Sequence, residues 1–157
     1  MRISTAATLM MVLGMTPALA QSAPPATEPY RPGLGDLMTM TVQPRHIKLL
    51  IGAHEQNWAY AKYELHELQE AFDRAVRVWP RFKGFPLGGM IDSIVKGPMD
   101  ELTKDIDRKD EIAFDAGYEK LTEGCNACHQ AANVVQVVIK VPNASSFPDQ
   151  DFSPIKP

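Results

Sequence analysis

The sequence predicts an all-α fold, an antiparallel four-helix bundle followed by an irregular C-terminal tail. Between residues 34 and 132, apolar residues recur every three or four positions in four segments, the spacing that gives a helix one buried face. Proline, glycine or charged residues separate these segments and end or interrupt helices. The length of the chain is enough for one domain with one hydrophobic core.

The first twenty residues have the pattern of a signal peptide. Arg2 precedes an apolar stretch, residues 6–13, and Ala18-Leu19-Ala20 forms a small-x-small cleavage site. A glycine and a proline interrupt the apolar stretch, which is also too short to span a membrane, so an uncleaved anchor is disfavoured. We therefore expect cleavage after Ala20 and export to the periplasm.

Cleavage would leave a mildly acidic chain of 137 residues, with 15 Lys and Arg against 19 Asp and Glu. Nucleic acids and anionic membranes are bound by basic clusters, so we expect neither as a partner. No other stretch is long and apolar enough to predict a membrane span. Residues 21–33 hold four prolines among small and polar residues and are expected to form a flexible leader.

The first helix is expected from Leu34, with Pro44 interrupting it. Proline lacks the amide proton and crowds the preceding turn, so we expect a kink or a restart near Gln43. The predicted buried stripe consists of Leu37, Met40, Pro44, Ile47, Ile51 and His54.

The second helix is expected to begin after Asn57, a favourable N-cap residue, and to end at Pro80. Its apolar stripe consists of Trp58, Ala61, Leu65, Leu68, Phe72, Ala75 and Trp79. Core packing and contact with a second copy of the chain are both open for this stripe. The opposite face is expected to be solvated and carries Lys62, Glu64, Glu67, Glu70, Asp73 and Arg77.

The third and fourth helices follow a connection rich in glycine, residues 81–89. Gly97-Pro98 predicts a break inside the third helix. The third apolar stripe consists of Ile91, Ile94, Val95, Met99, Leu102 and Ile106, and the fourth of Phe114, Tyr118, Leu121, Cys125, Cys128 and Ala132. Residues 134–141 are β-branched and predict either a helix extension or a short strand. Residues 142–157 hold four prolines and are expected to form the irregular tail.

The run Cys125-Asn126-Ala127-Cys128-His129 is the C-x-x-C-H signature of c-type haem attachment. On a helix these two cysteines and the histidine share one face, so two thioethers and a proximal imidazole can reach one haem. The chain has only two cysteines, which excludes a four-thiolate zinc site, and no βαβ pattern supports a thioredoxin-like pair. We expect one covalent haem c, bound by Cys125 and Cys128 with His129 on the iron, in a haem-binding domain of residues 34–141. A simple disulfide, in an interaction or structural module, is the alternative.

The four helical segments with this motif in the last one resemble the class II cytochromes c, which comprise the cytochromes c′ and their low-spin relatives. Within residues 34–132, several runs also resemble small exported bacterial monohaem cytochromes c. These runs are Leu34-Gly35-Asp36-Leu37-Met38, Arg45-His46-Ile47-Lys48-Leu49, Asn57-Trp58 and Tyr63-Glu64-Leu65-His66-Glu67-Leu68. The chain departs from the class II pattern at Pro44, at Gly97-Pro98 and in its long tail.

The resemblance leaves the sixth iron ligand open. In low-spin members a methionine of the first helix fills this position, which favours Met38, with Met40 as an alternative. His46 is a further alternative, since imidazole also binds haem iron. Arg45 and Lys48 are expected to contact the haem propionates.

The sixth ligand decides between two functions. Histidine and methionine together suit an electron carrier with redox protein partners, which is not an enzyme. An open position, as in the cytochromes c′, would instead suit a five-coordinate protein that binds NO or CO. A peroxidase would need a distal base and a cation, for which His46 and Arg45 have the right chemistry.

Overall fold

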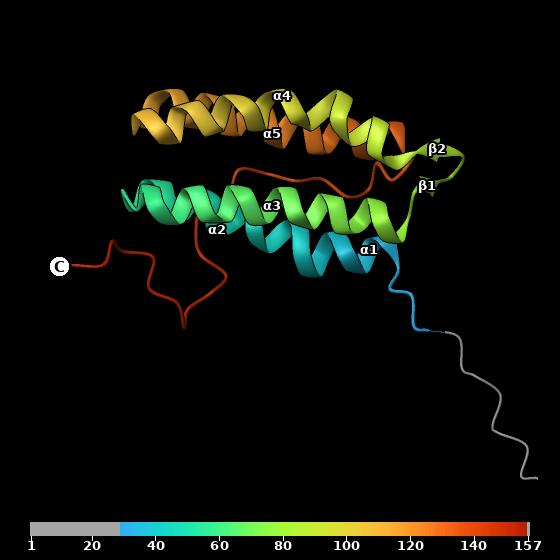
Figure 1. The fold of residues 1–157 in the computed structure, drawn as a ribbon, viewed down its shortest axis with the longest axis horizontal. Coiled ribbons are helices and arrows are strands. Elements are labelled where there is room, and N and C mark those ends of the chain that lie inside the picture. Colours follow the sequence, from blue (N-terminus) through green and yellow to red (C-terminus); the bar gives the residue numbers. More distant parts are fainter. Residues whose placement is uncertain (1–28, 157) are drawn as a thin grey trace, which may run out of the picture. The chain divides into compact units, whose positions relative to one another are not determined.

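The computed structural model describes residues 29–156 (Figure 1). The predicted signal peptide and residues 21–28 of the predicted leader lie outside this range. The residues from Arg31 onward form one compact unit. Within the described residues the regular structure is helical apart from one two-stranded hairpin, which confirms the prediction of an all-α fold.

The elements follow one another with short connections. In chain order they are α1 (Leu34–Leu37), the π-helix η1 (Met38–Val42), α2 (Gln43–His54), α3 (Trp58–Val78), β1 (Arg81–Phe82), β2 (Phe85–Pro86), α4 (Leu87–Arg108) and α5 (Glu111–Ala131). The strands β1 and β2 are antiparallel and pair Arg81 with Pro86.

The long helices pack in two neighbouring pairs. α2 packs on α3, α4 packs on α5, and contacts between α3 and α4 join the pairs. Figure 1 shows α2 and α3 side by side below α4 and α5. All four helices contribute to the core, which includes the fully buried side chains of Leu49, Leu68, Leu102, Phe114 and Leu121.

The first helical segment buries a different stripe from the predicted one. Met40 is 74% exposed and His54 is also exposed, so the predicted stripe is wrong at these positions. From Leu37 to the end of α2, the other buried residues are Val42, His46, Leu49, Leu50, Gly52 and Ala53. The cause is η1, in which the Gln43 N–H bonds the Met38 carbonyl five residues back and so adds one residue to the turn.

Pro44 explains where this wide turn lies. In a regular α-helix the residue at position 44 would donate to the Met40 carbonyl, but proline has no N–H and its ring crowds that carbonyl. Widening the preceding turn relieves the clash, and the α-helix restarts at Gln43. The predicted restart near Gln43 is confirmed.

α3 has the predicted start and the predicted buried stripe. The Asn57 side chain accepts a hydrogen bond from the Tyr60 N–H at 3.2 Å, as an N-cap does. The stripe from Trp58 to Ala75 packs into the chain's own core, so it offers no surface to a second copy. One prediction for the opposite face is wrong, because Glu64 is only 1% exposed.

α4 runs without a break from Leu87 to Arg108, with Pro98 inside it, so the predicted interruption at Gly97-Pro98 is wrong. Proline inside a helix costs about 3 kcal/mol. The same stretch of α4 buries Val95, Met99 and Leu102, and each such side chain contributes about 1.5–3 kcal/mol. Core packing on both sides of the proline therefore outweighs the lost hydrogen bond.

The segment after α5 is irregular but closely attached to the helices. Residues 134–141 form neither a helix nor a strand, so both structures predicted for them are wrong. We call residues 134–153 the C-terminal strap. In Figure 1 its first part crosses the view between the α4/α5 pair and the α2/α3 pair, and its later part turns down past α2 and α3. Its far end is anchored by Phe152, which is buried and packs its ring on Tyr60.

The last residues of the predicted leader also contact the helices. The Arg31 guanidinium donates to the carbonyl of Val78 and lies 3.7 Å from the centre of the Trp79 ring. The Trp79 indole N–H donates to the Pro32 carbonyl at 2.9 Å. These contacts hold the entry to α1 against the end of α3.

Candidate functional site

The two cysteines and the histidine of the C-x-x-C-H motif line one cavity of about 210 Å³. They lie in the last two turns of α5, where positions three and four apart share a face. Earlier on the same face, Phe114, Tyr118 and Leu121 are fully buried and fix the rotation of the helix. The buried face of α5 thus directs the motif toward the inside of the molecule.

Apolar walls of this cavity come from the first helical segment, from α3 and α4, from the hairpin and from the C-terminal strap. The helical walls include Leu34, Met38, Val42, Phe72, Leu87, Met90, Ile91 and Val95. The remaining walls come from parts that the sequence did not place at the site, namely Phe82 of the hairpin and Val134, Val137 and Ile139 of the C-terminal strap. The β-branched composition of residues 134–141 was the only signal for the strap, and it does not say what the strap covers.

Cys125 and Cys128 are free thiols held in low-dielectric surroundings. Burial, with a smaller effect of Cys128, raises the pKa of Cys125 to about 11, and burial also raises the pKa of Cys128. Both side chains are therefore protonated at neutral pH. Reactive cysteines have lowered pKa values, so this arrangement does not suit a thiolate nucleophile.

The ring of His129 is oriented by the C-terminal strap. Its Nδ1 lies 2.7 Å from the carbonyl oxygen of Val137. A carbonyl can only accept, so Nδ1 carries the proton and donates, and Nε2 keeps its lone pair for a metal. A hydrogen bond of this kind usually fixes the tautomer of a metal-binding histidine.

His46 lines the same cavity but is engaged by other side chains. It is 4% exposed, with Nε2 at 3.0 Å from the Thr122 hydroxyl and Nδ1 at 2.9 Å from the Tyr118 hydroxyl. Burial lowers the pKa of His46 to about 4, so the ring is neutral. Both ring nitrogens are used in these contacts, which makes His46 a poor metal ligand in this arrangement.

The two methionines near the start of the helical segment are placed differently. Met38 is half-buried, packs against the core and lines the cavity. Met40 is on the surface and lies outside the cavity. Of the two, only Met38 is placed where a ligand of the same cavity would be.

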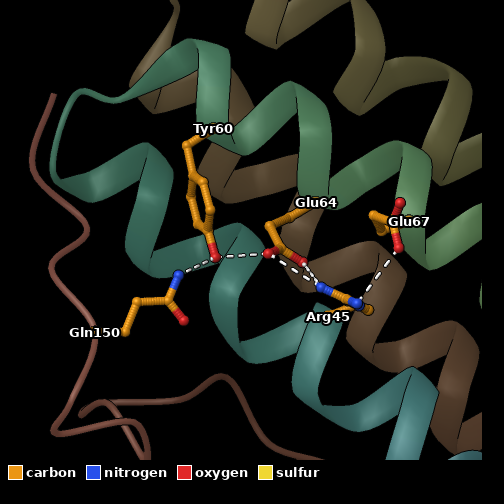
Figure 2. A network of polar contacts seen from close by, with 5 residues as sticks. All are labelled: Arg45, Tyr60, Glu64, Glu67 and Gln150. Carbon is orange, nitrogen blue, oxygen red and sulfur yellow. Dashed lines mark hydrogen bonds and ion pairs between the residues drawn. The ribbon is translucent and has the colours of Figure 1, made fainter. Parts of the chain in front are cut away.

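Arg45 belongs to a polar network (Figure 2) and does not line the cavity. Its guanidinium pairs with Glu64 at 3.2 Å and with Glu67 at 3.3 Å. The Tyr60 hydroxyl donates to Glu64 at 2.6 Å and accepts from the Gln150 amide at 2.7 Å. Burial, together with the hydrogen bond to Glu64, raises the pKa of Tyr60.

This network joins α2, α3 and the C-terminal strap, and it gives Arg45 two protein carboxylates as partners (Figure 2). The ammonium group of Lys48 lies 4.4 Å from the centre of the Phe147 ring, which is also part of the strap. Neither cation lines the cavity. The structure therefore does not bring Arg45 and Lys48 together with the motif, as contacts to haem propionates would require.

Searches for a metal-binding cluster, for a membrane-spanning helix and for similar known proteins add little to this site. Among residues 29–156, no group of three or more His, Cys, Asp or Glu side chains is gathered to hold a metal ion. None of the helices in the described part of the chain is both long and apolar enough to cross a membrane. No family model matches the chain, and no curated protein or solved structure matches it either.

Proposed function

We propose that this protein is an exported monohaem c-type cytochrome that carries electrons. The observation that carries this proposal is that Cys125, Cys128 and His129 line one apolar cavity, with the His129 ring oriented by a backbone carbonyl. Cys125 and Cys128 would hold haem c through thioether bonds, and Nε2 of His129 would be the proximal iron ligand. A porphyrin supplies four iron ligands itself, so the site needs only one or two from the protein.

The residues around the motif suit this cofactor. When bound, haem c supplies an iron that changes between the ferrous and ferric states. The apolar walls from α4, the hairpin and the strap would shield it from water on those sides. Val137 fixes the orientation of His129, so that the imidazole needs no rearrangement when the charge of the iron changes.

We also propose that α2, α3, α4 and α5 form the antiparallel four-helix bundle of the class II cytochromes c. The packing of α2 on α3 and of α4 on α5, with short connections between consecutive helices, supports this topology. The resemblance of the motif-bearing last helix to that family supports it as well.

Met38 is the proposed sixth ligand. In an antiparallel arrangement, α2 and α5 meet where His46 contacts Tyr118 and Thr122. At 1.5 Å per residue, Met38 lies about 12 Å before His46 along the first helical segment, and His129 lies about 10 Å beyond Thr122 along α5. Both side chains then reach the same end of the cavity. A histidine and a methionine on the iron keep one coordination in both oxidation states, which suits an electron carrier.

Export to the periplasm is part of the proposal and rests on the signal-peptide pattern of residues 1–20. Outside the cytosol, thiols tend to oxidise unless they are captured. Haem attachment would capture both thiols of the chain. Redox proteins of the same compartment are the proposed partners.

The visible absorption spectrum of the ferrous protein, recorded with and without CO, tests the proposed function. We expect sharp low-spin bands that CO does not change, because Met38 fills the sixth position. Broad high-spin bands that shift with CO would contradict electron transfer through a six-coordinate haem. They would favour a gas-binding protein of the cytochrome c′ type instead.

A further inference from the structure

Asn126 lies between the two cysteines of the motif and binds the C-terminal strap with both ends of its side-chain amide. Its Nδ2 donates to the Ile139 carbonyl at 2.9 Å, and its Oδ1 accepts from the Ile139 N–H at 2.8 Å. A primary amide matches the donor and the acceptor of one backbone residue, so this pair of bonds fixes both position and direction. The strap is therefore clamped directly to the motif.

The clamp lies two residues from the carbonyl that contacts His129. Val137 accepts from His129 Nδ1 at 2.7 Å, and Ile139 is held by Asn126. On the other side, the Val134 N–H donates to the carbonyl of His129 at 2.8 Å. The short stretch from Val134 to Ile139 is thus tied to α5 at both ends, and the Val137 carbonyl has little freedom to move.

The hydrogen bond at Nδ1 affects how strongly an imidazole donates to a metal. A partner that accepts the Nδ1 proton raises the basicity of the ring and fixes its orientation. A more basic ligand stabilises the higher positive charge of the ferric iron. Loss of this bond would therefore shift the reduction potential to more positive values.

We infer that Asn126 is a positioning residue for His129, which acts by clamping the strap so that the Val137 carbonyl accepts the Nδ1 proton. The inference rests on the proposed haem site and deepens it. Asn126 touches neither ring nitrogen, so its effect on the histidine passes through Ile139 and Val137.

The test compares substitutions at Asn126 with the same change elsewhere in the strap. Asn126→Asp replaces the Nδ2 donor by a carboxylate oxygen facing the Ile139 carbonyl, and Asn126→Ala removes both bonds. Asn143→Asp is the matched control, because Asn143 is an exposed asparagine of the same strap. The haem-loaded full chain is used for redox titration, and amide hydrogen exchange of Ile139 reports on the clamp.

We expect both Asn126 variants to keep covalent haem, to show at least tenfold faster exchange of the Ile139 amide and to have a more positive reduction potential. The Asn143→Asp control should change neither quantity. An unchanged potential in both Asn126 variants, together with faster exchange, would overturn the inference, because the clamp would then not act on His129.

A measurement on the unchanged protein keeps the test independent of variant folding. In nitrogen-resolved NMR spectra, the Nδ1 proton of His129 should be protected from exchange with water. An Nδ1 proton that exchanges as fast as in free imidazole would overturn the inference even when haem is present. Absence of covalent haem from the unchanged protein would instead contradict the proposed function, so the two failures are distinguishable.

Discussion

Met38 and Met40 are two residues apart in the sequence, yet only Met38 lines the cavity. The sequence made both of them plausible ligands, because the predicted stripe included Met40 and the family resemblance favoured Met38. The π-helix decides between them by changing the rotation of the segment relative to α2. A one-residue change in a helical turn is not visible in the spacing of apolar residues.

We predict that Met38→Ala converts the ferrous protein from low spin to high spin and lets it bind CO. The reason is that the proposed sixth ligand is removed and alanine has no atom that binds iron. Met40→Ala is the matched control, because the exposed Met40 side chain should leave the visible spectrum unchanged. A changed spectrum in Met40→Ala and an unchanged one in Met38→Ala would reverse the assignment.

We predict that the buried His46 side chain makes the stability of the protein depend on pH. Burial lowers its pKa to about 4, below its ordinary value of 6.5. The unfolded chain therefore binds this proton below about pH 6.5 and the folded chain only below about pH 4. The free energy of unfolding should fall across this window as the pH drops, by up to about 3 kcal/mol. Above pH 6.5 the group contributes no pH dependence.

Denaturant unfolding between pH 7 and pH 4 checks this prediction, at roughly 1.4 kcal/mol for each unit of pKa shift. His46→Gln should flatten the pH dependence, and His66→Gln, at an exposed position of α3, is the control that should not. The same pH dependence in the unchanged protein and in His46→Gln would show that other groups cause the acid destabilisation.

At the scale of elements, α5 packs closely on α4 next to the motif. A Cβ atom added at Gly124 would lie 3.3 Å from the Ile94 carbonyl oxygen and 3.3 Å from its Cγ2 atom. Pro98 lacks the N–H that would bond to this carbonyl in a regular helix. Gly124 therefore lets α5 approach the part of α4 that contains the proline.

Gly124→Ala is predicted to destabilise the protein by about 1–3 kcal/mol, because the backbone of α4 cannot move away easily. Gly89→Ala is the control on α4, because the nearest atom to an added Cβ there is Pro86 Cγ at 3.9 Å, an ordinary contact. There alanine should stabilise the helix by about 0.5–1 kcal/mol. Thermal unfolding measures both, and a stabilising Gly124→Ala would contradict the close packing.

The Glu64 network predicts a link between α3 and the C-terminal strap (Figure 2). Glu64→Ala removes the acceptor of Tyr60 and one partner of Arg45, and should cost about 2–4 kcal/mol. It should also expose the strap to trypsin at Lys140, because Gln150 loses its fixed partner. Glu119→Ala, an exposed control on α5, should stay within about 0.5 kcal/mol and leave cleavage unchanged.

The sequence predicts some of these elements well and others poorly, for physical reasons. Most positions of the stripes predicted for α3, α4 and α5 are buried, because regular helices keep one phase over many residues, and Trp79, Ile94, Cys125 and Cys128 are partly buried. The stripe of the first segment is partly wrong because η1 shifts that phase. In the sequence, Glu64 looks like a surface residue because it is charged and lies on the polar face of its helix. It can be buried because Arg45, which is far from it in sequence, compensates its charge. Long-range pairing of this kind leaves no local pattern.

At the scale of the whole molecule, the cavity depends on parts from nearly the entire compact unit. The motif predicts one wall, and helical spacing predicts the walls from α3 and α4. The hairpin and the C-terminal strap close the cavity through tertiary contacts that periodicity does not encode. The position of the motif in an apolar cavity supports the proposed haem site.

The mass of the mature chain purified from the periplasm tests the central claim most directly. We predict a chain cleaved after Ala20 that carries one covalently bound haem, and loss of this attachment in the Cys125→Ser, Cys128→Ser double variant. A mature chain without haem, in which Cys125 and Cys128 form a disulfide, would contradict the account.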